Sequence, residues 1–454
     1  MAKIAPLSGF PEWLPEGRIV EQKLLDTLRA TFELHGFSGI ETRAVEPVSQ
    51  LLSKGETSKE IYLLERLQAR ENSGAAAKKE AELGLHFDLT VPLARYVLEH
   101  AGHLDFPFRR YQIQKVWRGE RPQDGRFREF VQADVDVVGA DQLAFHHEIE
   151  LPLVMVDALS KLPIPRVVIR ASNRKVAQGF YEAIGIENVE ETLRILDKLD
   201  KVGSDAIIEM LRDGVGASEE QARLALELAS IATPDASFAD RVLALGYRSE
   251  LLEEGLDELV RLVEGANELI PGSLTADLKI ARGLDYYTGS VYESTLIGHE
   301  DLGSVCSGGR YDSLVSDGKR SYPGVGLSIG VSRILARVIG NSIVTPSRKV
   351  PTAVLVAVNN ESERRHAEKT AYALRRRGIP TEVSPSSAKF GKQIKYADKR
   401  GIPFVWFTTE AGEQVKDIRS GEQVSADVAA WAPPAPDLHP QLSRDAAGEA
   451  GGDE

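Results

Sequence analysis

The sequence is poor in cysteine and lacks the features of exported or membrane proteins. Cys306 is the only cysteine among 454 residues, so no disulfide framework can form within the chain. No apolar run approaches the ~20 residues that a helix needs to cross a bilayer. The first residues, MAKIAPLSGFPEWLPEG, contain no apolar core with a cleavage site. We therefore expect a large globular protein of the reducing cytoplasm that has no membrane partner.

Two common nucleotide-binding motifs are also missing. The sequence has no G-x-x-x-x-G-K-[ST], and the run GVGLSIG, which starts at Gly324, lacks the spacing of a dinucleotide-binding loop. Any bound nucleotide must therefore be held in another way.

The overall charge is acidic, but the acidity is concentrated in one region. The chain has a net charge of -13, and residues 175–270 alone hold 21 acidic and 9 basic residues, a net charge of -12. Apolar residues recur there at every third or fourth position, which predicts amphipathic helices with acidic faces toward solvent. The remainder is nearly neutral, so the net charge does not exclude a nucleic-acid partner.

Two segments carry an excess of basic residues. Residues 106–130 hold seven basic residues against three acidic ones, and residues 364–400 hold eleven against three. A basic face of this kind can neutralise several phosphates of a nucleic acid. The alternative is an ordinary element with Lys and Arg on its solvent side.

The hydrophobic pattern predicts helices and strands in one mixed arrangement. A helix is expected from Arg18 to Phe37, and the stretches RRYQIQKVWRGE, REFVQADVDVVG and SVYESTL are typical of antiparallel strands in a mixed sheet. Strand character precedes the acidic window in RVVIRAS and returns in LTADLKIARGLDYY. We therefore expect residues 175–270 to be a helical insertion in one domain.

The C-terminal part has a different pattern. Residues 341–351 are rich in Ser, Pro and basic residues and are predicted to be a linker. Strand and helix patterns then alternate, as in a small α/β domain. From Pro433 onward the sequence is rich in Pro, Ala and Gly, and we expect this tail to be disordered. Residues 70–83 are predicted to be an exposed loop.

An arginine-rich hairpin is the first candidate site. In VWRGERPQDGRFREF, Arg118 precedes a turn at PQDG, and Arg126 and Arg128 return on the other strand on one face. Several guanidinium groups directed at one place suit a polyphosphate, because each offers paired donors and a permanent charge. The alternative is cross-strand pairing of these arginines with Glu120 and Glu129.

Two further segments are candidates only in combination. ARGLDYYTGSVYE contains Arg282, Tyr286 and Tyr287, and GSVCSGGRYD follows it with paired glycines that would let the backbone approach a ligand closely. GVGLSIGVSRI places a glycine-rich strand before a helix that bears Arg333. Each segment alone is also compatible with an ordinary strand or turn.

Together and in this order, the segments resemble the histidyl-tRNA synthetase family of class II aminoacyl-tRNA synthetases. RRYQIQKVWRGERPQDGRFREFVQADVDVVG resembles motif 2, GVGLSIGVSRI resembles motif 3, and ARGLDYYTGSVYE with GGRYD resembles the histidine-specific motifs. The resemblance implies an α+β fold: a class II catalytic domain on an antiparallel sheet with a helical insertion, and a C-terminal α/β anticodon-binding domain. Its expected parts are the catalytic domain (1–174 and 271–340), the insertion (175–270), the anticodon-binding domain (350–432) and the tail (433–454).

The resemblance implies a histidine–tRNA ligase. In such an enzyme, the histidine carboxylate attacks the α-phosphate of ATP and releases diphosphate, and the histidyl group then passes to the 3′ end of tRNA(His). Fixed positive charges near the phosphates stabilise this transition state. ATP would enter with Mg²⁺ as part of the substrate, and no structural metal is expected.

The match to the motifs assigns roles at the nucleotide. Arg118 and Arg282 would flank the α-phosphate as the catalytic arginines. Arg126 and Arg333 would hold the outer phosphates. Glu120 would lie on the adenine side of the nucleotide, and Phe130 would stack on the base.

The match also assigns the histidine site, in which Arg282 and Tyr286 are included. Asp88, Thr90 and Gln132 match the contacts of the ammonium group. Asp136, four residues after Gln132 on the same strand face, matches the acid that binds the imidazole. Tyr287 and Tyr311 would complete that pocket. An apolar amino acid would leave these polar groups unpaired, which gives the site its selectivity.

The sequence departs from the family pattern at motif 1. ETRAVEP has Arg43 where we expect the motif 1 proline, and Pro47 follows four residues later. The resemblance implies a homodimer, but this departure leaves its motif 1 contacts unassigned. Asp88 stands where many bacterial relatives have Glu.

The main alternative is the paralogue that senses histidine as a regulatory subunit of ATP phosphoribosyltransferase. That paralogue typically lacks the anticodon-binding domain and has an eroded arginine motif. Arg118, Arg282 and the basic segment 364–400 are all present here, which favours the ligase.

Two smaller features are assigned structural roles. His146, His147 and Glu148 could suggest a metal site, but adjacent histidines on a helix cannot both face one ion, so a surface helix is expected. Cys306 is expected to be a small packed residue rather than a nucleophile.

Overall fold

The computed structural model describes residues 5–52, 60–66, 82–280, 287–316, 318–410 and 412–444, without the side chain of residue 200. The chain divides into two compact units, of which the first comprises residues 1–11 and 25–337 and the second residues 12–24 and 338–454. Within the described residues, no helix has the length and apolar character needed to span a bilayer.

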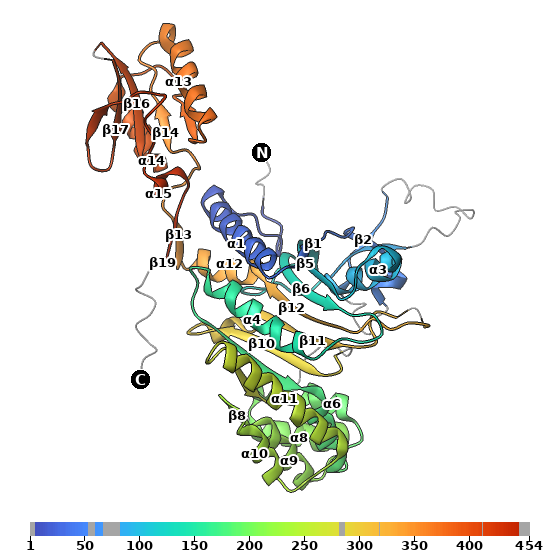
Figure 1. Ribbon diagram of the computed structural model, residues 1–454. Coiled ribbons are helices and arrows are strands. Elements are labelled where there is room, and N and C mark those ends of the chain that lie inside the picture. Colours follow the sequence, from blue (N-terminus) through green and yellow to red (C-terminus); the bar gives the residue numbers. More distant parts are fainter. Residues whose placement is uncertain are drawn as a thin grey trace. The chain divides into compact units, whose positions relative to one another are not determined.

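A nine-stranded mixed sheet forms the centre of the first unit (Figure 1). Its strands, in spatial order, are β1 (Ser38–Gly39), β5 (Phe108–Trp117), β6 (Glu129–Val138), β12 (Gly324–Gly330), β11 (Cys306–Tyr311), β10 (Ser290–Leu296), β7 (Val167–Asn173), β9 (Leu274–Asp277) and β8 (Ala232–Thr233). The β1–β5 and β7–β9 pairs are parallel, and the other neighbours are antiparallel. The prediction of antiparallel strands in a mixed sheet is therefore confirmed.

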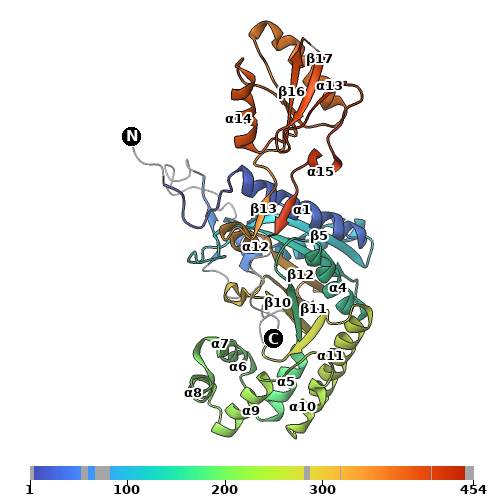
Figure 2. The same cartoon turned by 90° about the vertical axis from the view of Figure 1, so that its left-hand side faces the viewer.

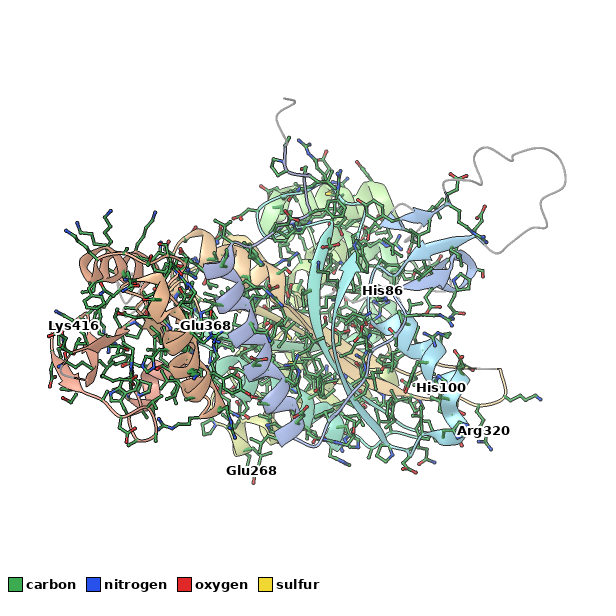
Figure 3. All side chains as sticks on the ribbon, turned by 90° about the horizontal axis from the view of Figure 1, so that it is seen from above. His86, His100, Glu268, Arg320, Glu368 and Lys416 are labelled. Atoms are coloured by element: carbon green, nitrogen blue, oxygen red, sulfur yellow. The ribbon has the colours of Figure 1, made fainter. Side chains whose placement is uncertain are left out.

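Helices and a small sheet flank the central sheet. The helices are α1 (Pro15–Leu34), α2 (Val48–Leu51), α3 (Thr90–His100), α4 (His146–Ser160) and α12 (Val331–Gly340), with short 3₁₀ turns at Ala101–His103 and Glu300–Leu302. A three-stranded antiparallel sheet has the order β2 (Val45–Pro47), β4 (Leu83–Leu85), β3 (Leu63–Leu64). Figure 3 shows the side chains from above. His86, which is labelled there, makes a hydrogen bond to the backbone of β5. The helix α1 starts and ends three residues before the expected limits.

Seven helices lie beyond the β7–β9–β8 end of the sheet (Figures 1 and 2). They are α5 (Arg174–Ala183), α6 (Val189–Leu196), α7 (Leu199–Val202), α8 (Ser204–Val215), α9 (Glu219–Ala229), α10 (Phe238–Ala244) and α11 (Glu250–Leu269). Gly179 and Gly255 let α5 and α11 cross closely, because a Cβ at these positions would lie 2.4 Å and 2.6 Å from backbone nitrogens of the facing helix. The segment leaves the sheet after β7, contributes the edge strand β8, and ends at β9, the parallel neighbour of β7.

The second unit contains a five-stranded sheet between helices. The order is β15 (Thr381–Val383), β14 (Val354–Val356), β16 (Phe404–Thr409), β17 (Gly412–Asp417), β18 (Gln423–Ser425), and the helices are α13 (Arg364–Arg376), α14 (Phe390–Arg400) and α15 (Ala435–Leu438), with a 3₁₀ turn at Glu361–Glu363. Alternate residues of β14 and β16 pack into two separate cores, one with α13 and one with α14. Figure 2 shows these two helices on opposite sides of the sheet.

The expected disordered tail and linker differ from the structure. The linker contains β13 (Val344–Pro346), which pairs with β19 (Leu442–Arg444). The tail prediction is wrong for residues 433–444, because α15 and β19 lie there. The buried Arg348 donates to the carbonyl oxygens of Asp437 and Leu438, at 2.8 Å and 3.0 Å, and holds this segment in place. Residues 445–454 and residues 70–81 of the predicted loop 70–83 lie outside the described residues, and Leu83 belongs to β4.

Candidate active site

One face of β6 carries a row of functional side chains. These side chains occupy every second position of the strand, so they project to the same side of the sheet. They are Phe130, Gln132, Asp134 and Asp136. In the antiparallel register, Asp136 lies between Arg110 of β5 and Gly326 of β12. The sheet therefore presents polar groups in rows that run across several strands.

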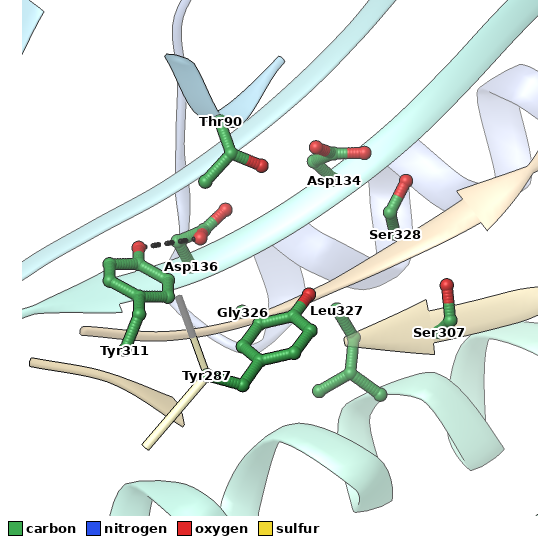
Figure 4. Close-up of a pocket in the computed structure, with 9 residues that line it drawn as sticks. All are labelled: Thr90, Asp134, Asp136, Tyr287, Ser307, Tyr311, Gly326, Leu327 and Ser328. Carbon is green, nitrogen blue, oxygen red and sulfur yellow. Dashed lines mark hydrogen bonds between the residues drawn. The ribbon is translucent and has the colours of Figure 1, made fainter. Parts of the chain in front are cut away.

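A pocket lies on this face (Figure 4). Its lining residues are Thr90, Asp134, Asp136, Tyr287, Ser307, Tyr311, Gly326, Leu327 and Ser328. The Tyr311 hydroxyl donates a 2.8 Å hydrogen bond to Asp136 Oδ1. Burial, together with the charge of Asp136, raises the pKa of Tyr311 well above its usual value, so the phenol stays a donor. The structure thus brings together four of the predicted histidine-binding residues.

Glycine at position 326 makes room for the acid. A Cβ there would lie 2.0 Å from Asp136 Oδ1, whereas the open position lets the carboxylate reach Tyr311. The paired glycines allow close packing within the protein. A Cβ on Gly308 would lie 2.0 Å from the Gly326 carbonyl oxygen, and one on Gly309 would lie 2.9 Å from the ring of Tyr287. Their predicted approach to a ligand stays a prediction.

A buried cation neutralises part of the charge in this pocket. Arg110 is fully buried, and its Nη2 lies 2.7 Å from Asp136 Oδ2 and 4.0 Å from Asp134 Oδ2. Burial, only partly offset by Arg110, raises the pKa of Asp134 to about 7. The sequence-based interpretation missed both residues as parts of the site. Asp134 lies on the same strand face as Gln132 and Asp136, so the alternating pattern that related those two residues could also have predicted Asp134.

The predicted ammonium-binding residues lie around the same face. Asp88 is buried, and its Oδ1 accepts a 3.0 Å hydrogen bond from the backbone N–H of Val91, in the first turn of α3. Thr90 is the first residue of that helix and lines the pocket. Gln132 donates a 2.8 Å hydrogen bond from Nε2 to Ser328 Oγ, while its buried Oε1 has no partner among the described residues.

Arg118 lies where β5 enters the hairpin. Its Nε donates a 3.0 Å hydrogen bond to the Phe87 carbonyl oxygen, and its guanidinium carbon lies 5.1 Å from the centre of the Phe130 ring. Glu120 Oε1 is 3.9 Å from Nη1. The terminal nitrogens of Arg118 make no hydrogen bond within the described part of the chain. Arg118, Glu120 and Phe130, all predicted to bind the nucleotide, are therefore neighbours. The hydrogen bond to Phe87 orients Arg118 and leaves its terminal N–H groups available as donors.

The motif 3 arginine meets the turn of the hairpin. Arg333, on α12, donates from Nε to the Gly125 carbonyl oxygen at 3.3 Å and from Nη1 to the Ser304 carbonyl oxygen. Gly125 has φ of 65°, which glycine adopts without strain. Arg126 follows directly and forms no ion pair with any described residue. The structure therefore places Arg126 and Arg333 beside the same turn.

The alternative, pairing of the hairpin arginines with Glu120 and Glu129, is seen for Arg118 and Glu120 but not for Glu129. Glu129 accepts hydrogen bonds from Lys115 Nζ at 2.6 Å and Trp117 Nε1 at 2.8 Å rather than from an arginine across the turn. Arg109 pairs with Glu150 on α4 at 2.6 Å. With Arg110 buried beside Asp136, the basic segment 106–130 offers fewer solvent-facing charges than its composition suggests.

The opposite face of the sheet packs against α4. Arg310 there forms a 2.8 Å ion pair with Glu148, which is 1% exposed, and the Tyr292 hydroxyl donates to the Glu148 carbonyl oxygen at 2.7 Å. His147 Nδ1 lies 3.0 Å from Glu150 Oε2. The predicted surface helix is therefore half buried, because its acids neutralise arginines of the sheet. No group of three or more metal-binding side chains occurs in the described ranges.

Four residues remain to be compared with the sequence-based assignments. Cys306 is 2% exposed, and burial raises the pKa of its thiol to about 12, as expected of a packed residue. Arg282 and Tyr286 lie outside the described residues. His86, which sequence reasoning did not single out, is fully buried, stacks on Trp117 and makes a 2.7 Å hydrogen bond through Nε2 to the Lys115 carbonyl oxygen.

Sequence comparisons match nearly the whole chain. The sequence profile described as histidyl-tRNA synthetase matches residues 9–334, and that of an anticodon binding domain matches residues 352–431. The histidine–tRNA ligase of Micrococcus luteus is 58% identical over 98% of this chain and 99% of its own length. That of Cutibacterium acnes is 56% identical over 97% and 99%.

Structure comparisons give a consistent result. The crystal structure of histidyl-tRNA synthetase from Nostoc sp. PCC 7120 has a TM-score of 0.83 and 36% identity, covering 93% of this chain and 97% of that one. A structure from Bacillus halodurans C, titled as an ATP phosphoribosyltransferase regulatory subunit/histidyl-tRNA synthetase, has a TM-score of 0.70 at 19% identity over 86% and 96%. At that identity the likeness concerns the fold alone.

Proposed function

The chain belongs to the histidyl-tRNA synthetase family, and from this membership we propose how its residues carry out the reaction of a histidine–tRNA ligase. The enzyme activates histidine with ATP and transfers the histidyl group to tRNA. One observation carries the assignment of the site. The same face of β6 leads from the Asp136–Tyr311 pocket at one end to Phe130 and Arg118 at the other.

Histidine occupies the pocket with its imidazole toward Asp136. Tyr311 holds this carboxylate in place and Arg110 pairs with it from behind, which leaves it oriented to accept the imidazole N–H. Tyr287 closes the pocket. Asp88, Thr90 and Gln132 bind the ammonium group, which directs the carboxylate of histidine toward the arginine hairpin.

ATP lies along the hairpin. Arg118 is oriented by its hydrogen bond to Phe87, so its free donors meet the α-phosphate without reorganisation as negative charge develops there. Arg126 and Arg333 hold the outer phosphates, Phe130 stacks on the adenine, and Glu120 lies on the adenine side. Mg²⁺ arrives with ATP as part of the substrate. Arg282 is the second arginine at the α-phosphate.

The remaining assignments concern the whole chain. Residues 1–174 and 271–340 form the catalytic domain, residues 175–270 its helical insertion, and residues 350–432 the anticodon-binding domain. The enzyme works as a homodimer in the cytoplasm. The regulatory-subunit alternative is less well supported, because the relatives that are more than half identical are histidine–tRNA ligases.

Histidine-dependent ATP–diphosphate exchange tests the role of Arg118. We expect Arg118→Ala to lower the exchange kcat by about 10²–10³-fold, because one preorganised cation at the reacting phosphate is lost. Arg121→Ala is the matched control, since Arg121 is exposed in the same hairpin and makes no described ion pair. Equal activity of the two variants would contradict the assignment.

A further inference from the structure

Asp134 is a carboxylate of the pocket to which the reaction so far gives no role. It lies midway between Gln132 and Asp136 on β6 and opposite Ser328 of β12. Its side chain is 4% exposed, and it borders the pocket together with Thr90 (Figure 4). A buried acid in this position needs a partner, since burying an unpaired charge is costly.

One carboxylate oxygen of Asp134 has no hydrogen-bond partner within the described residues. This atom, Oδ1, is buried. Ser328 hydrogen-bonds to the carboxylate, and Arg110 lies 4.0 Å from Oδ2 but only 2.7 Å from Asp136. The other charged or titratable groups around Asp134 are Asp136 from β6, Asp88 before α3, Cys306 and Tyr311 from β11, and Tyr287. The buried Oδ1 is therefore an acceptor that a bound donor can satisfy.

We propose that Asp134 is a further histidine-binding residue whose carboxylate accepts a hydrogen bond from the α-ammonium group of the substrate. The proposal rests on the proposed function and adds one contact to those of Asp88, Thr90 and Gln132. The neutral imidazole offers a single N–H, for which Asp136 is already placed. The ammonium group brings a full positive charge and three donors, one of which can satisfy the buried Oδ1 of Asp134.

This role makes histidine binding depend on pH. With a pKa of about 7 in the free protein, Asp134 is partly protonated at neutral pH, and it must lose that proton to pair with an ammonium group. The KM for histidine therefore falls as the pH rises from 6 to 8. The variant Asp134→Asn keeps only the part of this dependence that comes from the imidazole of histidine, which has a pKa of about 6.5 and binds in its neutral form.

The same acid lowers the stability of the free protein. Its pKa is raised above the ordinary value of 3.8, so the folded state binds a proton more tightly than the unfolded state does. Stability from this group is therefore lost as the pH rises from about 4 to about 7. Asp134→Asn removes the penalty, so this variant should melt at a higher temperature than wild type at pH 8, and the difference should vanish below pH 4.

Calorimetric titration with two ligands tests the proposal. Histidine carries the ammonium group, and 3-(imidazol-4-yl)propionate lacks it but keeps the imidazole and the carboxylate. We expect Asp134→Asn to weaken histidine binding roughly 10- to 100-fold, because one charge-assisted hydrogen bond to the ammonium group is lost. The affinity for 3-(imidazol-4-yl)propionate should not change, because this ligand has no ammonium group. Asp141→Asn, at an exposed position outside the pocket, is the control and should change neither affinity.

Three results would overturn the proposal. An equal loss for both ligands would place Asp134 at the imidazole, an unchanged histidine affinity would remove it from the site, and a lower melting temperature at pH 8 would make its role structural. Histidine-dependent ATP–diphosphate exchange by the wild-type protein tests the proposed function separately. A ligase catalyses this exchange whether or not Asp134 binds the ammonium group, so exchange without an effect of Asp134→Asn would refute only the role of Asp134.

Discussion

At the scale of single residues, the hydrogen bond between Tyr311 and Asp136 is the contact to which we assign the selection of histidine. Both are buried, and Arg110 supports the pair from β5. Because the hydroxyl fixes the carboxylate rather than the reacting atoms, the tyrosine acts on binding more than on chemistry.

We predict that Tyr311→Phe raises the KM for histidine about tenfold while the exchange kcat changes little, since one hydrogen bond to a charged group is lost. Tyr111→Phe is the matched control. Tyr111 donates a 2.7 Å hydrogen bond to Glu33 outside the pocket, so this change should lower stability by about 1 kcal/mol without raising the KM. Similar KM values in both variants would refute the role of Tyr311.

Sequence reasoning at this scale found the residues that the motifs name and missed those that support them. Gln132 and Asp136 followed from the motif and from their spacing. Arg110 was counted as part of a basic surface, because composition cannot reveal that the neighbouring strand places it beneath Asp136. Such ion pairs depend on strand register, which only the folded sheet defines.

At the scale of secondary structure, β6 and β12 build the floor of the site together. Their register puts Gly326 beside Asp136, so the glycine-rich motif 3 strand makes room for the carboxylate of the pocket. The alternating pattern predicted β5, β6 and β10 closely because each strand has one core-facing side. The short strands β13 and β19 were missed, since three residues carry too little pattern.

Gly326→Ala tests this shared floor. The added methyl group would overlap Asp136 Oδ1, which cannot move easily because Arg110 and Tyr311 hold it. We expect the KM for histidine to rise at least 100-fold, roughly the loss of 3 kcal/mol of binding. Gly340→Ala, at the end of α12, has open space around its Cβ and serves as the control. A normal KM in Gly326→Ala with folding retained would contradict the packing argument.

At the scale of the whole molecule, the acidic net charge is compatible with a nucleic-acid partner because acidic and basic residues lie in different parts of the chain. The acidic helices α5–α11 account for most of the net charge. In the second unit, three exposed lysines of α14, Lys392, Lys395 and Lys399, recur at helical spacing and form no ion pair with described residues. The α+β fold and the C-terminal domain were predicted correctly because long motifs and strong alternation specify them.

These lysines are predicted to bind tRNA phosphates. Changing all three to Gln should raise the KM for tRNA about 10-fold or more and reduce the salt dependence of charging, while diphosphate exchange stays unchanged. The control changes Lys201, Arg212 and Arg241, exposed in the acidic helices, to Gln and removes the same charge. An equal effect of both triple variants on charging would show that net charge alone matters.

The central claim is that the pocket on β6 activates histidine, and ATP–diphosphate exchange with a panel of amino acids tests it most directly. The account predicts that histidine alone supports exchange, since other side chains leave Asp136 and Tyr311 without their partner. A wild-type protein that binds histidine without catalysing exchange, or that exchanges equally well with another amino acid, would contradict it.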